Sequence, residues 1–315
     1  MSIKLASERE WVLADFDLAA TLTSGQAFRW RFVDGGWEAV VAGRWVRLEQ
    51  RPFGIRAVTS AFCANWEWIE EYLRLGDDMP AILASFPDDP PMRSAQASCR
   101  GLRLLRQDPW ESLASFIASS SKQIVQIQEI VRLLSERFGE PVKVPPDRPP
   151  LWKFPTVERL ATATEIELRN CKLGFRAPYL LGTARRIVFG ELNLASLRNL
   201  ELRVARDALM ECPGVGRKIA ECVLLFGYGF PTAFPVDVWI RKALHRLYFP
   251  KVRRMSPQRL ERFVESHFGT NSGYAQQYLF HYVRTQLGRQ WSGERRVRKG
   301  PPKRQQSKVG HGDKN

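Results

Sequence analysis

The stretch that decides the fold is 212-CPGVGRKIAEC-222. Its glycines, Gly214 and Gly216, lie between two segments of helical periodicity. We therefore expect a tight hairpin, in which both glycines can take positive φ and let another backbone come close. The amides of the hairpin and of the next helix's first turn would point outward, an arrangement that attracts phosphate. The stretch lacks the GxxxxGK[ST] spacing of a P-loop. It predicts either a phosphate-binding hairpin or a glycine-capped hairpin without a ligand.

Lys218 follows the hairpin and shares a helix face with Cys222, because four residues separate the two. A lysine in a first turn opposes the helix dipole. The same positive surroundings help an ammonium to release its proton, as a nucleophilic amine requires. A solvated surface lysine is the alternative. Asp237, in 234-FPVDVWI-240, precedes another helical pattern and is predicted to be its N-cap. A carboxylate fixed at a helix start can also act on a nearby reacting centre.

The remaining chain predicts an α+β protein. Residues 27-AFRWRFVDGGWEAVVAGRWVRLEQ-50 alternate between apolar and polar, which indicates a β-meander with short hairpins. A helix is predicted in 63–76, and 86-FPDDPPM-92 is predicted to be a loop. From about residue 105, apolar residues recur at helical spacing. We expect an antiparallel β domain over 1–100, a mostly helical domain over 101–290 and a disordered basic tail over 291–315.

The charge of the chain favours a polyanionic partner. The formal net charge is +15, and residues 289–315 hold nine Lys and Arg against two acidic residues. Such a balance is typical of nucleic-acid binding, although a merely charged soluble surface is the alternative.

The cysteines and the apolar pattern indicate the cellular compartment in which we expect the protein. Five scattered cysteines without a CxxC pair indicate neither a zinc ribbon nor a disulfide framework, and they fit a reducing cytosol. The chain start lacks the apolar run of a signal peptide, and no window of about 18 apolar residues is present. We expect no secretion, no membrane span, and a location in the bacterial cytoplasm and nucleoid or in a eukaryotic nucleus.

Several ordered motifs identify a family. The stretch 209-LMECPGVGRKIAEC-222 followed by 234-FPVDVWI-240 resembles the helix-hairpin-helix DNA glycosylases with a Gly/Pro/Asp loop, most of all the 8-oxoguanine DNA glycosylase/lyases. Residues 22-LTSGQAFRW-30, 108-DPWESLASFIASS-120, 173-LGFRAPYL-180 and 273-GYAQQYLF-280 match further segments in the same order. The resemblance covers nearly the whole chain except the tail. It implies an N-terminal TBP-like β domain packed on a helical core, and a glycosylase with AP lyase activity acting in base excision repair.

The resemblance also implies the catalytic pair. Lys218 corresponds to the nucleophile, whose amine attacks C1′ of the damaged nucleotide and displaces the base. The Schiff base that results permits β-elimination of the 3′ phosphate. Asp237 corresponds to the family's aspartate, which stabilises positive charge on the sugar.

A pocket for the extruded base is implied by four residues. The Gly25 carbonyl would accept from the N7–H that 8-oxoguanine has and guanine lacks, and Gln276 would read the Watson–Crick edge. Phe280 and Cys222 would cover the two faces of the base. Ordinary core packing of Phe280 and a plain turn at Gly25 are the alternatives.

The implied DNA contacts depart from the family pattern in places. They are Ser121, Gln123, Phe175, Arg176, Gly214, Val215, Gly216 and Trp239. An Asn-rich stretch is replaced by 121-SKQ-123, an arginine by Gln126, a tyrosine by Phe175 and a histidine by Trp239. The cytosine opposite the lesion loses hydrogen-bond partners, so we expect weaker discrimination for it.

The expected cofactor content is small. The carbonyls of Met210, Cys212 and Val215 would bind a monovalent cation, as in relatives, and no other cofactor is expected. No cysteine follows Cys222, which excludes the iron–sulfur branch. We expect a monomer that binds double-stranded DNA containing oxidised guanine. Two alternatives remain: a glycosylase for alkylated or other damaged purines on the same fold, and a non-catalytic DNA-binding module.

Overall fold

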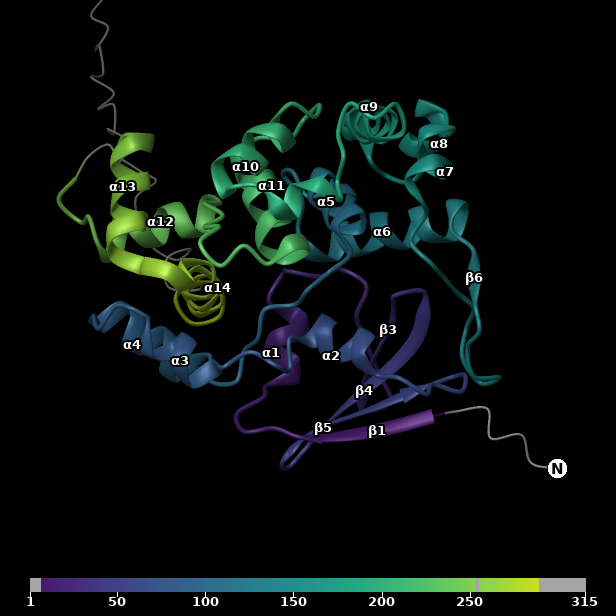
Figure 1. The fold of residues 1–315 in the computed structure, drawn as a ribbon, viewed down its shortest axis with the longest axis horizontal. Helices are drawn as coiled ribbons and strands as arrows, with labels where there is room; N and C mark the ends of the chain where they lie inside the picture. Colours follow the sequence, from purple (N-terminus) through teal and green to yellow (C-terminus); the bar gives the residue numbers. More distant parts are fainter. Residues whose placement is uncertain (1–6, 253–254, 289–315) are drawn as a thin grey trace, which may run out of the picture.

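A computed structural model describes residues 7–252 and 255–288, and it confirms the predicted α+β class. The N-terminal part is a five-stranded antiparallel sheet in the order β1-β5-β4-β3-β2 (Figure 1). The strands are β1 Ser7–Val12, β2 Arg31–Val33, β3 Gly36–Val41, β4 Arg44–Arg51 and β5 Gly54–Thr59. The predicted tail, 291–315, lies outside the described residues, and the predicted domain limits stay predictions.

The two predicted hairpins of the meander follow from their turn residues. Asp34 and Gly35 join β2 to β3, and Ala42 and Gly43 join β3 to β4; all four have positive φ. Two consecutive residues of positive φ match the twist of a two-residue hairpin, which is why glycine takes the second position of each turn.

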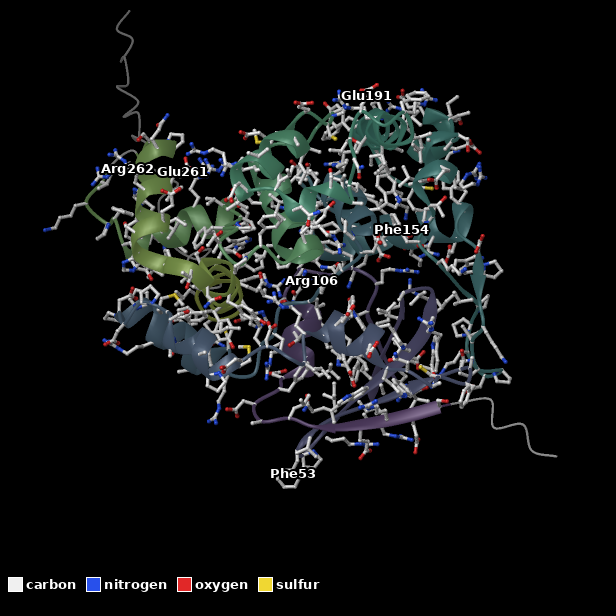
Figure 2. The ribbon with its side chains drawn as sticks, in the orientation of Figure 1. Phe53, Arg106, Phe154, Glu191, Glu261 and Arg262 are labelled. Carbon is white, nitrogen blue, oxygen red and sulfur yellow. The ribbon has the colours of Figure 1, made fainter. Side chains whose placement is uncertain are left out.

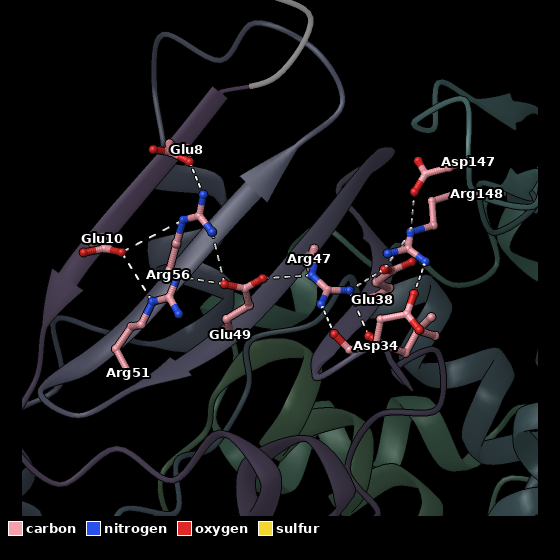
Figure 3. Close-up of polar contacts among 11 residues, drawn as sticks. Glu8, Glu10, Asp34, Glu38, Arg47, Glu49, Arg51, Arg56, Asp147 and Arg148 are labelled. Carbon is pink, nitrogen blue, oxygen red and sulfur yellow. Dashed lines mark hydrogen bonds and ion pairs between the residues drawn. The ribbon is translucent and has the colours of Figure 1, made fainter.

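The sheet uses its two faces differently. Alternate residues such as Val46, Leu48 and Ile55 are fully buried against α1 (Leu18–Thr23) and α2 (Glu67–Leu73), which lie between the sheet and the helical body (Figure 1). The opposite face carries a ladder of cross-strand ion pairs (Figure 3). Its members are Glu8, Glu10, Glu38, Arg47, Glu49, Arg51 and Arg56. Arg148 extends it to Asp34 at 2.6 Å and Glu38 at 3.2 Å, which ties a distant loop to the sheet.

The rest of the described chain is mainly helical. The α-helices are α3 Met79–Ala84, α4 Pro90–Ser98, α5 Pro109–Ala118, α6 Ile124–Phe138, α7 Val157–Ala161, α8 Glu165–Asn170, α9 Ala177–Val188, α10 Leu202–Met210, α11 Arg217–Val223, α12 Val238–Leu247, α13 Pro257–Phe268 and α14 Ser272–Tyr282. Short 3-10 turns are η1 Gly174–Arg176, η2 Ser196–Asn199 and η4 Gly269–Asn271, and a small hairpin pairs β6 Pro141–Val142 with β7 Leu151–Trp152. Two π-helical segments, η3 Leu224–Tyr228 and η5 Val283–Leu287, extend α11 and α14.

Helix α5 forms the centre of the helical body. Its residues from Ser112 to Ala118 are buried, and it packs against α6, α9 and α11. The helical pattern of 109–138 divides into α5 and α6 at a turn in which Ser121 has a φ of 56°. This turn lies beside α11, so it brings Ser119 to the site described below.

Helices α3 and α4 leave the sheet and join the helical body, where α4 packs on α14 (Figure 1). The loop predicted for 86–92 is shorter than expected, because α4 already starts at Pro90. Asp89 caps it by accepting from the Met92 amide at 2.8 Å. A capping Asp before a proline at the first helical position is a standard helix start. No helix in the described ranges is both long and apolar enough to span a membrane.

Candidate active site

The helix-hairpin-helix is formed by α10 and α11, and its two glycines differ. Gly214 has a φ of 73°, as predicted, and an added Cβ would lie 2.5 Å from the Tyr179 ring. Gly216 does not use the positive φ open to a glycine, since its φ is −92° and its ψ is 175°. Gly216 is the N-cap of α11, and open space surrounds the position of its missing Cβ. A glycine is therefore not needed at this position to relieve backbone strain or a close contact.

Lys218 is the second residue of α11 and points toward α5. Its Nζ lies 3.5 Å from the Ser119 Oγ and 5.1 Å from the centre of the Phe116 ring. Burial raises the pKa of the Cys222 thiol to about 11, and the charge and hydrogen bond of Lys218 act against this rise. The two side chains therefore face each other, which confirms the predicted shared helix face and places the amine half-buried in the protein.

Asp237 is the predicted N-cap of α12. Its carboxylate accepts from the Ile240 amide at 2.8 Å, which confirms the capping role. Burial raises the pKa of the Asp237 carboxyl; the amides of Ile240 and Trp239 and the positive charges of Lys218 and Arg284 oppose the rise. A carboxylate and an amine from separate helices thus lie within electrostatic reach of each other.

Of the predicted base-pocket residues, Gly25 and Phe280 come together. Gly25 has a φ of 81°, and an added Cβ would lie 3.5 Å from a Phe280 ring carbon. Gln276 is only 3% exposed, and its Nε2 donates to the Pro235 carbonyl at 3.1 Å, two residues before Asp237. Its Oε1 is buried without a hydrogen-bond partner. Because a buried acceptor without a donor costs about 1–3 kcal/mol, this oxygen is suited to a ligand.

Arg284 also belongs to this group, and the sequence reading missed it. Its Nη2 donates to the Thr23 carbonyl at 2.6 Å, and its guanidinium lies 5.6 Å from the centre of the Phe280 ring. The signal was available, because Arg284 follows Phe280 by four residues and so shares its helix face.

The residues predicted to contact DNA lie at two places on the surface. Phe175 belongs to η1 and is 56% exposed, and the centre of its ring lies 4.1 Å from the Arg176 guanidinium carbon. Arg176 is buried and donates to the carbonyls of Ser120 and Leu173, so its charge faces inward. The Gln123 amide donates to Gln126 Oε1 at 3.0 Å, which commits that side chain to starting α6.

The other predicted contacts lie in the hairpin and at the start of α12. Trp239 packs against Gly288 and carries Lys242 above its ring at 5.6 Å. Met210 is exposed at the end of α10, and the Cys212 carbonyl accepts from the Val215 amide at 3.1 Å. Across residues 7–252 and 255–288, no group of three or more His, Cys, Asp or Glu side chains is arranged to hold a metal ion.

A buried ion pair braces the hairpin from behind. Arg206 of α10 binds Glu221 of α11 at 3.0 Å, with side chains 9% and 4% exposed. Glu221 also accepts from the Phe234 amide at 3.0 Å, just before the Asp237 turn. Glu261 lies on the side of α13 that faces α10 and α11 (Figure 2), where it binds Arg217 at 2.8 Å. These contacts line a cavity of about 980 Å³ that Lys218 borders, but Gly25 and Phe280 do not.

The family models cover most of the chain. Residues 11–113 match the N-terminal domain of 8-oxoguanine DNA glycosylase, and residues 114–267 match the HhH-GPD superfamily of base excision DNA repair proteins.

Individual relatives agree with this match. A probable N-glycosylase/DNA lyase of Methanothermobacter thermautotrophicus is 31% identical over 86% of this chain and 95% of its own length. An N-glycosylase/DNA lyase of Arabidopsis thaliana is 30% identical over 84% of this chain and 77% of its own. The 8-oxoguanine glycosylase/lyase of Clostridium acetobutylicum, solved with double-stranded DNA containing cytosine opposite 8-oxoguanine, is 32% identical. It covers 90% of this chain and 99% of its own, with a TM-score of 0.79.

Proposed function

The chain belongs to the 8-oxoguanine DNA glycosylases of the helix-hairpin-helix superfamily, and on this premise we propose that Lys218 is the nucleophile that excises 8-oxoguanine from duplex DNA. The observation that carries this role is the placement of a half-buried amine beside Cys222, with the capping carboxylate of Asp237 within electrostatic reach. An amine held between helices in this way is positioned for attack rather than solvated at random.

The chemistry divides between these two side chains. The lone pair of the Lys218 amine forms a bond to C1′ while the C1′–N9 bond breaks, and the base leaves with that electron pair and takes up a proton. The sugar opens to a protonated Schiff base, which acidifies C2′–H, and loss of this proton expels the 3′ phosphate. Asp237 faces the positive charge that develops on the sugar, and its hydrogen bond from Ile240 keeps the carboxylate in place.

The base leaves the helical stack to reach this centre, which costs a few kcal/mol. The buried Oε1 of Gln276 accepts from the N1–H and N2–H donors of the guanine edge. The Gly25 carbonyl accepts from N7–H, which is the group that distinguishes the lesion from guanine. Phe280 stacks on one face of the base and Cys222 contacts the other.

The surrounding surface holds the DNA. The amides of Gly214 and Gly216 bind a phosphate, Val215 lies between them with its own amide bonded to the Cys212 carbonyl, and Trp239 contacts the DNA backbone. Ser121, Gln123, Phe175 and Arg176 surround the place that the lesion vacates. The carbonyls of Met210, Cys212 and Val215 offer acceptor oxygens at the negative end of α10, which fits a monovalent cation. The enzyme acts as a monomer, without any other cofactor, in the compartment that holds the DNA.

Borohydride trapping tests the proposal. A duplex with 8-oxoguanine or a preformed abasic site is incubated with borohydride, and the covalent adduct is separated by denaturing electrophoresis. The parent protein is expected to form an adduct and Lys218→Gln to form none. Lys172→Gln is the matched control, since Lys172 is exposed and bound to Glu129 at 2.9 Å. Retained DNA binding without any adduct in the parent would support a binding module instead.

A substrate panel separates the two enzymatic functions. Duplexes with 8-oxoguanine, an alkylated purine or uracil differ at the positions that Gly25 and Gln276 read. Faster cleavage of the 8-oxoguanine duplex supports the pocket described here. Preferred cleavage of the alkylated duplex would assign the pocket to another purine lesion.

A further inference from the structure

The loop that carries Gly25 is held by two side chains from the C-terminal end of the chain. Gln277 of α14 donates to the Ser24 carbonyl at 3.1 Å, and Arg284 of η5 donates to the Thr23 carbonyl at 2.6 Å. The two donors are seven residues apart and so lie on one face. Within the described part of the chain, the next carbonyl, that of Gly25, accepts from no donor. The loop is thus fixed just before the one carbonyl that stays available.

Arg284 also lies close to both Gly25 and Phe280 of the proposed base pocket. Its Nη1 would lie 3.8 Å from a Cβ added to Gly25, and its guanidinium carbon lies 5.6 Å from the centre of the Phe280 ring. A cation at this distance from an aromatic ring is attracted to it. One side chain therefore contacts both the loop of Gly25, whose carbonyl would read the edge of the base, and Phe280, which would stack on one of its faces.

We propose that Arg284 is a positioning residue for lesion recognition, which sets the Gly25 carbonyl against Phe280 so that it meets the N7–H of 8-oxoguanine. This inference rests on the proposed roles of Gly25 and Phe280. Arg284 acts through these residues and takes no part in bond breaking. Its loss moves the carbonyl that reads the base and leaves Lys218, which reacts with the sugar, in place on α11.

Two substrates separate these steps. Single-turnover excision of 8-oxoguanine needs the base pocket, whereas strand cleavage at a preformed abasic site needs only the sugar chemistry. Arg284→Met keeps the aliphatic stem and removes the donors. It is expected to slow 8-oxoguanine excision by about 10- to 100-fold, the loss of one hydrogen bond from a charged donor. Abasic-site cleavage is expected to fall much less than excision, because there the loss of Arg284 acts only through its charge, which opposes the raised pKa of Asp237. Arg284→Lys, which keeps a charged donor, is expected to fall between parent and Arg284→Met.

A matched control and a second variant make the test decisive. Arg100→Met removes an exposed arginine that binds Asp15 at 2.8 Å, and it is expected to leave both activities unchanged. Gln277→Leu combined with Arg284→Met is expected to cost less than the two separate losses together, since both residues hold one loop. Thermal unfolding of each variant checks that the fold persists.

Unchanged 8-oxoguanine excision by Arg284→Met would overturn the inference, and so would an equal loss on the abasic substrate. Strictly additive losses in the combined variant would overturn the shared role of the two donors. A parent protein that does not excise 8-oxoguanine would instead overturn the proposed function, so the two failures are distinguishable.

Discussion

Replacing Arg206 with Met leaves the carboxylate of Glu221 buried without its main partner. The pair is 3.0 Å long and its side chains are 9% and 4% exposed. Breaking one partner of a buried pair costs about 3–5 kcal/mol, because the remaining charge stays desolvated. Arg217 lies 3.7 Å from the same carboxylate and compensates in part, so we expect the lower end, about 3 kcal/mol.

Urea unfolding followed by tryptophan fluorescence measures this loss. A fall of that size lowers Tm by roughly 5 °C for a protein of this length, because the entropy of unfolding is about 2.1 cal/mol/K per residue. Arg203→Met is the control, because Arg203 is exposed on the same helix, and it is expected to cost less than about 0.5 kcal/mol. Glu221→Gln removes the charge but keeps an acceptor for the Phe234 amide. Added to Arg206→Met, it is expected to recover more than half of the loss. A loss below about 1 kcal/mol for Arg206→Met, or no recovery in the double variant, would refute the reasoning.

Three further predictions concern the site. In Gly214→Ala the new methyl group would have to accommodate a positive φ and would meet the Tyr179 ring. Urea titrations are expected to show that it lowers the free energy of unfolding by about 1–3 kcal/mol. Gly216→Ala is the control: its methyl group enters open space, and its loss is expected to be less than about 1 kcal/mol. Asp237→Asn removes a carboxylate that burial destabilises, so its Tm is expected to exceed that of the parent at neutral pH while excision falls about 10-fold or more. The Tm difference is expected to vanish as pH falls through the raised pKa of Asp237, because the parent carboxyl is then neutral too. Excision assays with each base opposite 8-oxoguanine are expected to give a shallow preference, since Gln126 is committed to the start of α6 and Arg176 faces inward; a steep preference for cytosine would contradict this.

The parts of the fold that could be predicted are those that depend on neighbouring residues. The Asp237 cap, the shared face of Lys218 and Cys222 and the meander hairpins all follow from spacing within a few positions. The φ of Gly216 could not be predicted, because a glycine is compatible with both an extended N-cap and a left-handed turn.

Contacts across the chain were beyond the sequence reading. Arg206 and Glu221 form a buried ion pair, and Glu261 of α13 lies 3.6 Å from Arg206, whereas charged residues at helical spacing usually face water. The inward turn of Arg176 depends in the same way on the Ser120 carbonyl, which comes from another helix boundary. Whether a charged side chain faces inward is decided by packing between elements, and this packing leaves no periodic pattern in the sequence.

The hydrogen bond from Arg284 to Thr23 spans 261 positions of the chain. During synthesis on the ribosome, the amine of Lys218, which we propose as the nucleophile, therefore emerges before the proposed base pocket is complete. A chain released after α11 but before α14 would carry Lys218 without the α14 residues of the proposed base pocket. Selectivity is acquired last, when the final helices dock against a segment made at the very beginning.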